Sequence, residues 1–342
     1  MMFAAALSLA AGATQAQTFF YVGPDSGDFF TLANWNTAAD GTGSAPAAGS
    51  LPDASVGDIA LDLIIDGRSV LAAGEVDFGT GSLGLSNAAS LEITGAGNDV
   101  DFSADATLTV TGASLAADGD VVFRGNTNLL NATITASTDD VEFQDTAIVS
   151  VVNSNLTAGD NLFFDAFNGS ITGSNLVSSD RLGLRGPGGS TTAVVVTDTN
   201  ITVNAGLGDV DDVFDFGQGD ASLTLLGDST LLADAIEETV DLILGDRSTA
   251  TLGGNGNRIV NDGSTVTVAS FDARLIVGSA INFDPRDDVV NGLTGLSYLD
   301  DPTAWTVSDW NGLDAITLQL IPEPTSLALL GLGGLVVLRR RR

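Results

Sequence analysis

The chain has 342 residues and a formal net charge of −32, and it contains no lysine, histidine or cysteine. Without these residues it cannot form a Ser-His-Asp triad, a cysteine nucleophile, a Schiff-base lysine, a disulfide, or a zinc site with histidine or cysteine ligands. The negative charge also argues against nucleic-acid binding, because a basic surface supplies most of the affinity for phosphate backbones.

The acidic residues indicate a chain rich in turns. Of the 44 acidic residues only six are glutamate, and the rest are aspartate. Aspartate hydrogen-bonds to its own backbone in turns, whereas glutamate favours helices. With 41 glycines as well, the composition predicts an all-β protein with little helix.

The N-terminal part of the chain predicts an export signal followed by a cap. Residues 1–16 are apolar and end in small residues, and they resemble a secretory signal peptide without its positive n-region. Residues 17–57 contain Trp35 and several phenylalanines, which we expect to cover the open end of a repeat structure. A sugar-stacking role for Trp35 is the alternative. The order of Gly27-Asp28-Phe29, Asn34-Trp35, the turn at Pro52-Asp53 and the alternating strand Asp58–Asp66 resembles the opening segment of many exported bacterial β-helix proteins.

A short phrase recurs through the central part of the chain. Successive copies begin with an acidic or polar residue, continue with Val or Leu and end with Phe or Leu: Asp99–Phe102, Asp120–Phe123, Asp140–Phe143, Asn161–Phe164 and Arg181–Leu184. The steps between the Val/Leu positions are 21, 20, 21 and 20 residues. A constant period of this size, with three short strands in each lap, predicts a right-handed parallel β-helix over residues 58–280.

This fold makes specific predictions about side chains. Equivalent residues stack in successive strands, so Phe102, Phe123, Phe143 and Phe164 should form an internal aromatic ladder. The turn aspartates should form a negative ridge that attracts cations weakly: Asp99, Asp118, Asp120, Asp139, Asp140, Asp160 and Asp180. An antiparallel β-sandwich is the competing fold, but it would not require so constant a period. Residues 281–320 should then close the solenoid as a C-terminal cap.

The C-terminal residues 321–342 have three parts in a fixed order. Pro322, Glu323 and Pro324 are followed by the apolar run Leu327–Leu338, and the chain ends with four arginines, Arg339, Arg340, Arg341 and Arg342. The apolar run is shorter than the roughly 20 residues of a stable span, and the arginines favour the cytoplasmic side. The segment resembles a PEP-CTERM sorting signal. A plain C-terminal membrane anchor is the alternative.

The resemblance implies a short transmembrane sorting helix, transient anchoring in the inner membrane and processing by an exosortase near Pro322-Glu323-Pro324. It also implies release to the cell surface or an extracellular matrix. The body of the chain then resembles the β-helix of an autotransporter passenger. Export followed by membrane processing is therefore the expected route.

One acidic cluster carries a candidate metal site. Asp209, Asp211, Asp212 and Asp215 lie close together in a loop, and hard oxygen ligands of this kind suit Ca²⁺. Their spacing matches neither the EF-hand nor the nonapeptide calcium repeat, so solvated turn aspartates are the alternative. No other cofactor is indicated.

Three classes of function remain open. The expected one is an exported, non-catalytic surface or matrix protein that associates with exopolysaccharide through outward polar ladders such as Thr133, Thr135, Asn153 and Asn155. A polysaccharide lyase or glycoside hydrolase on a β-helix is the alternative, because stacked aspartates could supply paired carboxylates and Arg181 and Arg185 a base. An adhesin is the third class. No catalytic residue is predicted, because fold alone does not imply function.

Overall fold

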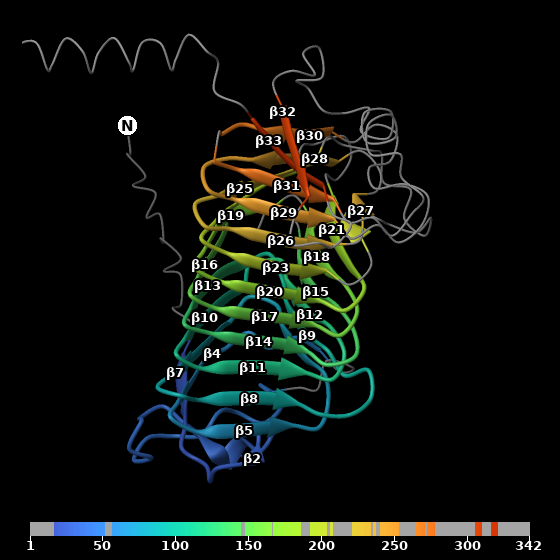
Figure 1. The fold of residues 1–342 in the computed structure, drawn as a ribbon. Coiled ribbons are helices and arrows are strands. Elements are labelled where there is room, and N and C mark those ends of the chain that lie inside the picture. Colours follow the sequence, from blue (N-terminus) through green and yellow to red (C-terminus); the bar gives the residue numbers. More distant parts are fainter. Residues whose placement is uncertain are drawn as a thin grey trace, which may run out of the picture.

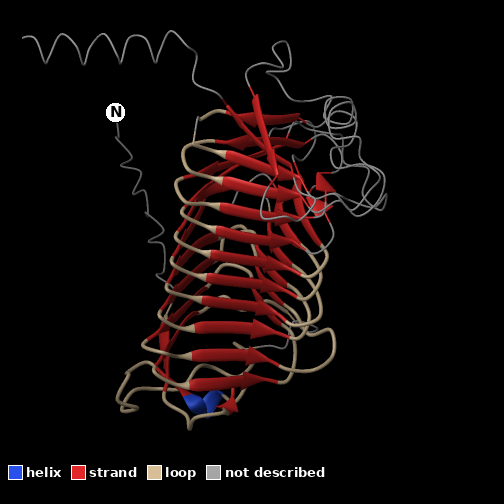
Figure 2. Ribbon diagram, viewed as in Figure 1, coloured by secondary structure: helices blue, strands red, loops and turns tan. Residues whose placement is uncertain are grey.

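The computed structural model describes residues 17–51, 57–144, 148–165, 167–185, 192–203, 206–207, 221–233, 235–236, 240–252, 265–270, 272–277, 305–309 and 316–320. These residues form a parallel β-solenoid of about eight turns with about 21 residues per turn (Figures 1 and 2). The predicted β-helix is therefore confirmed. In Figure 1 the strands facing the viewer run left to right while the chain climbs, so the winding is right-handed.

Three sheets, which we call A, B and C, run along the solenoid. Sheet A contains, in spatial order, β3 (Trp35–Asn36), β1 (Thr18–Tyr21), β4 (Asp62–Asp66), β7 (Ser82–Ser86), β10 (Thr107–Thr111), β13 (Asn126–Leu130), β16 (Ile148–Val152), β19 (Asn168–Thr172), β22 (Thr192–Thr197), β25 (Ala221–Leu226), β28 (Val240–Leu244) and β30 (Thr265–Val268). Sheet B faces the viewer in Figure 1. It contains β2 (Gly27–Asp28), β5 (Ser69–Ala72), β8 (Ser90–Ile93), β11 (Ser114–Ala117), β14 (Thr133–Ala136), β17 (Asn155–Ala158), β20 (Asn175–Ser178), β23 (Asn200–Val203), β26 (Thr230–Ala233), β29 (Thr249–Leu252), β31 (Arg274–Val277), β33 (Ile316–Leu320) and β32 (Trp305–Asp309).

Sheet C is shorter and completes each lap. It contains β27 (Ala235–Ile236), β24 (Gly206–Leu207), β21 (Arg181–Arg185), β18 (Leu162–Asp165), β15 (Val141–Phe143), β12 (Val121–Phe123), β9 (Val100–Phe102) and β6 (Val76–Phe78). The chain visits the sheets in the order A, B, C and then returns to A one lap higher. Each of the first four recurring phrases is thus a strand of sheet C with the turn residue before it, and the fifth, Arg181–Leu184, lies within β21.

The predicted aromatic ladder lies inside sheet C and is one residue longer than expected. Phe102, Phe123, Phe143 and Phe164 are all at most 1% exposed, and neighbouring rings stack with centroids 4.9–6.0 Å apart. Phe78 extends the ladder at 5.0 Å from Phe102. The sequence period did not reveal Phe78, because the step from Val76 to Val100 is 24 residues. Each stacked pair stabilises the folded state by about 0.5–1.5 kcal/mol beyond the contribution from burial of the rings.

One strand begins earlier than its polar composition indicates. The polar and glycine residues 124–128 predict a turn, but β13 begins at Asn126. Asn126 and Asn128 face solvent, whereas Thr127 is 3% exposed and occupies an inward position. The Thr127 hydroxyl donates to the carbonyl of Gly125 at 3.3 Å. An inward threonine in place of an aliphatic residue hid the alternation of this strand.

A second ladder, made of hydroxyl groups, lies at the corner where the chain passes from sheet A to sheet B. The last residue of the A strand is followed by a residue with positive φ, such as Asn131 (50°) or Asn153 (49°). Next comes a small inward residue, and in several laps this is a buried serine or threonine. The Ser154 hydroxyl accepts from the Ala132 N–H at 3.0 Å, and the Ser174 hydroxyl accepts from the Ser154 N–H at 3.1 Å. These bonds satisfy backbone groups that the strands leave unpaired at the corner.

The N-terminal segment covers the first lap. Strand β1 pairs parallel to β4, and β2 pairs parallel to β5. Trp35 is fully buried, and its indole N–H donates to the carbonyl of Phe29 at 2.7 Å. Rings of Tyr21 and Phe29 pack edge-on against it, each with a centroid distance of 5.3 Å. Burial contradicts the alternative that Trp35 stacks on a sugar. The 3₁₀ helix η1 (Leu32–Asn34) immediately precedes Trp35.

Toward the C-terminus the strand direction changes. Strand β33 pairs antiparallel with β31, and β32 pairs antiparallel with β33. Both strands fall within residues 281–320, which the sequence predicts to be the C-terminal cap. An antiparallel hairpin across the edge of a parallel sheet protects that edge from further strand addition.

Candidate functional site

The corner between sheets B and C gathers the acidic side chains of successive laps. Asp99, Asp120, Asp140 and Asn161 each immediately precede a strand of sheet C. The Asp99 carboxylate accepts from the Asp120 N–H at 2.8 Å, and the Asp120 carboxylate accepts from the Asp140 N–H at 2.9 Å. The Asp140 carboxylate accepts from the Asn161 N–H at 2.8 Å. We call this column the aspartate ladder.

Burial changes the acidity of the ladder. Loss of solvation raises the pKa of Asp120 to about 6, against the lowering effect of the Asp140 N–H. Loss of solvation also raises the pKa of Asp140 and of Asp160, and neighbouring aspartates add to both shifts. The carboxylates of Asp99, Asp120 and Asp140 therefore form a column at this corner, in which Asp120 is half-buried and titrates near pH 6.

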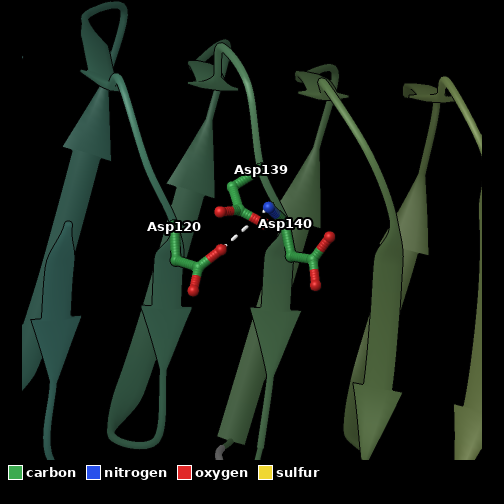
Figure 3. Close-up of side chains that lie close together, drawn as sticks. All are labelled: Asp120, Asp139 and Asp140. Carbon is green, nitrogen blue, oxygen red and sulfur yellow. Dashed lines mark hydrogen bonds between the residues drawn. The ribbon is translucent and has the colours of Figure 1, made fainter. Parts of the chain in front are cut away.

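Three carboxylates at this corner converge, two from the aspartate ladder and that of Asp139. Oxygen atoms of Asp120, Asp139 and Asp140 lie within 4.8 Å of one another (Figure 3). Figure 3 shows Asp139 between the other two, with a hydrogen bond that links the Asp140 N–H to Asp120. Oxygen ligands of this type suit a hard cation. However, clusters of exposed acidic groups are common in proteins without a bound cation. The hydrogen bond from the Asp140 N–H also gives the Asp120 carboxylate a structural role.

The outer face of sheet C is also charged. Arg124 forms an ion pair with Asp101, and its Nε donates to the Gln144 side-chain oxygen at 3.0 Å. The Gln144 amide in turn donates to the Glu142 carboxylate. These side chains belong to three neighbouring laps, so the network ties the laps together across the outer surface of sheet C.

In contrast, the outer faces of sheets A and B carry no charge in four consecutive laps. Each uncharged segment runs from the first residue of the A strand to the last residue of the B strand: 107–117, 126–136, 148–158 and 168–178. The charged residues described from residue 99 to residue 181 all lie on sheet C or in its flanking turns: Asp99, Asp101, Asp105, Asp118, Asp120, Arg124, Asp139, Asp140, Glu142, Asp160, Asp165, Asp180 and Arg181. We call the two surfaces the uncharged side and the acidic side.

Polar ladders run along the uncharged side. Thr133 pairs with Asn155, and Asn155 pairs with Asn175 in the next lap. Thr133 and Asn155 are exposed, Thr135 is half-exposed, and Asn153 is an exposed corner residue. The four polar positions singled out by the sequence therefore all point outward on this side.

Several sequence-predicted site residues fall outside the described residues. These are the calcium candidates Asp209, Asp211, Asp212 and Asp215, the sorting residues Pro322, Glu323 and Pro324, and the terminal residues Arg339–Arg342. Arg181 lies at the start of β21, where its Nε is 3.5 Å from a carboxylate oxygen of Asp180. Arg181 and Arg185 are therefore the first and last residues of a strand of sheet C, and Arg181 lies beside an acidic neighbour.

Sequence reasoning missed the segregation of charge, although the signal was present in the printed sequence. Each uncharged segment has 11 residues, and each is followed by a short acidic block. The acidic blocks were interpreted as turns, and their confinement to one side of every lap became visible only when the three sheets were assigned. A search for charged residues that recur with the same period as the apolar residues would have revealed this segregation.

Comparison with known proteins concerns only the C-terminal end. The described part of the chain contains no helix with the length and apolar character of a membrane span. No curated protein and no solved structure matches the chain. Residues 320–342 match the family described as the PEP-CTERM protein-sorting motif. This motif implies an exported protein that is held transiently at a membrane and processed by an exosortase.

Proposed function

We propose that the protein is a non-catalytic structural component of the cell surface or extracellular matrix that associates with exopolysaccharide. The match of residues 320–342 to the sorting motif carries this proposal. In it, the exosortase acts near Pro322-Glu323-Pro324, and Arg339–Arg342 hold the tail on the cytoplasmic side until processing. The β-solenoid is the part that reaches the matrix.

The uncharged side supports association with polysaccharide. Its outward hydroxyl and amide groups include those of Thr133, Asn153 and Asn155, which are exposed, and of Thr135, which is half-exposed. Such groups both donate and accept hydrogen bonds, as sugar hydroxyls do. A parallel solenoid repeats them at about 4.8 Å along its axis, which gives a regular surface for a repeating polymer.

The absence of catalysis is proposed on the chemistry of the chain. It has no histidine, lysine or cysteine, so an active site would rest on carboxylates, hydroxyls and arginines. Two of the three carboxylates that converge, those of Asp120 and Asp140, accept backbone N–H groups of the following lap. Their arrangement supports a role in holding the laps together.

A polysaccharide lyase or glycoside hydrolase is the second candidate. One observation favours it: the pKa of Asp120 rises to about 6 beside other carboxylates, and a raised pKa is typical of a general acid. Incubation of the secreted protein with acidic and neutral glycans, with and without calcium, would reveal new reducing ends or unsaturated products if it is an enzyme. We expect neither.

Localisation tests the proposal in the producing cells. Replacement of Pro322, Glu323 and Pro324 by alanine should leave the unprocessed chain at the membrane, whereas the natural chain should be recovered from the matrix. The secreted protein should also be retained on the producer's own purified polysaccharide. Equal distribution of both forms, or no retention, would contradict the proposal.

A further inference from the structure

The outer face of sheet A is the broadest part of the uncharged side. In seven consecutive strands, from β7 to β25, every outward position is uncharged. Three parallel columns result, bounded by Asp62 and Asp66 on β4 and by Asp241 on β28. The outward residues are Ser82, Gly84, Ser86, Thr107, Thr109, Thr111, Asn126, Asn128, Leu130, Ile148, Ser150, Val152, Asn168, Ser170, Thr172, Ala193, Val195, Thr197, Ser222, Thr224 and Leu226.

This face mixes hydroxyl and amide groups with exposed aliphatic side chains. Ile148 is 63% exposed, Val195 41% and Leu130 37%. Hydroxyls and amides can bond to sugar hydroxyls, while the aliphatic groups can cover the C–H surfaces of sugar rings. Sheet B offers only two outward columns, and the outer face of sheet C carries Asp101, Glu142 and Arg124.

The dimensions of the face suit a narrow, extended ligand. Seven strands at about 4.8 Å spacing and five residues of about 3.3 Å give an area on the order of 500 Å². A stable protein–protein interface buries about 800 Å² on each partner and is poor in serine. An extended polysaccharide chain is long and narrow, and it could follow the columns over all seven laps.

We propose that an uncharged polysaccharide binds in an extended form along the outer face of sheet A, parallel to the solenoid axis. This inference rests on the proposed association with polysaccharide and adds the class of glycan and the face that binds it. Charge selects the class: the chain carries a net charge of −32, so an anionic glycan would be repelled, and the face offers no cation to compensate.

The test compares two matched pairs of substitutions that add the same charge. Thr109→Asp with Ser170→Asp places two carboxylates on exposed positions of sheet A. Ser137→Asp with Ser179→Asp places two on exposed turn positions next to the aspartate ladder. The secreted full protein is run through gels that contain hydroxyethyl cellulose, dextran or amylose as uncharged probes, or alginate or hyaluronate as anionic ones.

We expect at least one uncharged polysaccharide to retard the natural protein and neither anionic one to do so. The sheet A pair should weaken binding at least ten-fold, and the turn pair less than two-fold. Thermal unfolding confirms that each variant is folded. If the sheet A pair does not fold, Thr109→Val with Ser170→Ala keeps the face uncharged, removes two hydroxyls and should weaken binding about two- to five-fold.

Several outcomes overturn the inference. They are an equal loss in both pairs, no loss in the sheet A pair, tighter binding of alginate or hyaluronate, or no binding of any uncharged probe. A dimer in sedimentation analysis that the sheet A pair disrupts, without glycan binding, would assign the face to a second copy of the chain. If all variants still bind the producer's own polysaccharide, only the assignment of the face fails. If the natural protein does not bind it, the proposed association fails as well.

Discussion

The two sides of the solenoid are built from the same laps but differ inside and outside. The acidic side has stacked phenylalanines inside and aspartates outside, whereas the uncharged side has aliphatic residues inside and a mixture of hydroxyl, amide and aliphatic groups outside. Residues at equivalent positions of the repeat stack along the solenoid axis. A preference for one residue type at one repeat position therefore produces a continuous column of that type along the molecule. The comparison indicates that, in the four laps with uncharged segments, the charged side chains lie on the side that does not meet the proposed ligand.

The largest expected effect is on the inside of the acidic side. Phe123→Ala removes the central ring of the ladder and leaves a cavity between Phe102 and Phe143, so it should lower the free energy of unfolding by about 3–5 kcal/mol. Urea denaturation measures the loss. The exposed Thr111→Ala on the uncharged side is the control and should change stability by less than about 0.5 kcal/mol. A loss below about 1 kcal/mol for Phe123→Ala would contradict the role of the ladder.

Two glycines on opposite sides sharpen the comparison. A Cβ added at Gly183 in sheet C would lie 2.2 Å from a ring carbon of Phe163, which covers it. Gly183→Val should therefore destabilise the protein by about 1–3 kcal/mol. A Cβ at Gly84 in sheet A would meet its nearest neighbour, Ile64, at 3.7 Å, so Gly84→Val should be neutral or slightly stabilising. Thermal unfolding that ranks the two variants in the opposite order would contradict this packing.

The aspartate ladder should make stability depend on pH. The pKa of Asp120 is about 6 in the folded protein and 3.8 as its ordinary value, so the folded state binds more protons between these values. Stability should then decrease as pH rises from about 4 to 7. Because Asp120 is half-buried, its share is about 1 kcal/mol, less than a two-unit shift would give for a fully buried group.

Asp120→Asn isolates this contribution. Asparagine occupies the equivalent ladder position at Asn161, and its side-chain oxygen can still accept the Asp140 N–H. The variant should match the natural protein at pH 4 and exceed it by about 1 kcal/mol at pH 7, as measured by denaturation at each pH. Asp105→Asn, in an exposed turn of the acidic side, controls for net charge. A constant offset across the pH range would contradict the proposed titration.

The smallest expected effect concerns salt. Binding of an uncharged glycan to the uncharged side forms no ion pairs, so an increase in salt from about 0.05 to 0.5 M should change the affinity less than about two-fold. Affinity electrophoresis at both concentrations measures it. A steep loss of binding with salt would place the contact on the acidic side.

The sequence predicted the solenoid because its strongest signal, an inward Val and Phe every 20 or 21 residues, is also what stacks in the core. The same reasoning failed at Asn126, where an inward threonine interrupts the apolar alternation, and at Phe78, where a longer turn changes the step. Buried Ser154 and Ser174 could not be identified, because their role depends on backbone groups of the next lap.

The candidate sites were less predictable than the fold. Asp120 and Asp140 were recognised as corner residues, but their hydrogen bonds and raised pKa depend on how deeply the corner is packed. The outward positions Thr133 and Asn155 followed from alternation alone. Alternation alone did not show that the outward residues of sheet A continue the same uncharged surface, because the extent of that surface depends on which strands lie side by side.

Radical footprinting tests the central claim most directly, namely that the uncharged side makes the contact through sheet A. Leu130 and Ile148 are exposed, oxidisable residues on that face, and Leu232, whose exposure of 50% lies between theirs, is the reference on sheet B. Addition of a bound uncharged polysaccharide should lower the oxidation of Leu130 and Ile148 several-fold and leave Leu232 unchanged. Equal protection of all three residues, or protection of Leu232 alone, would contradict the account.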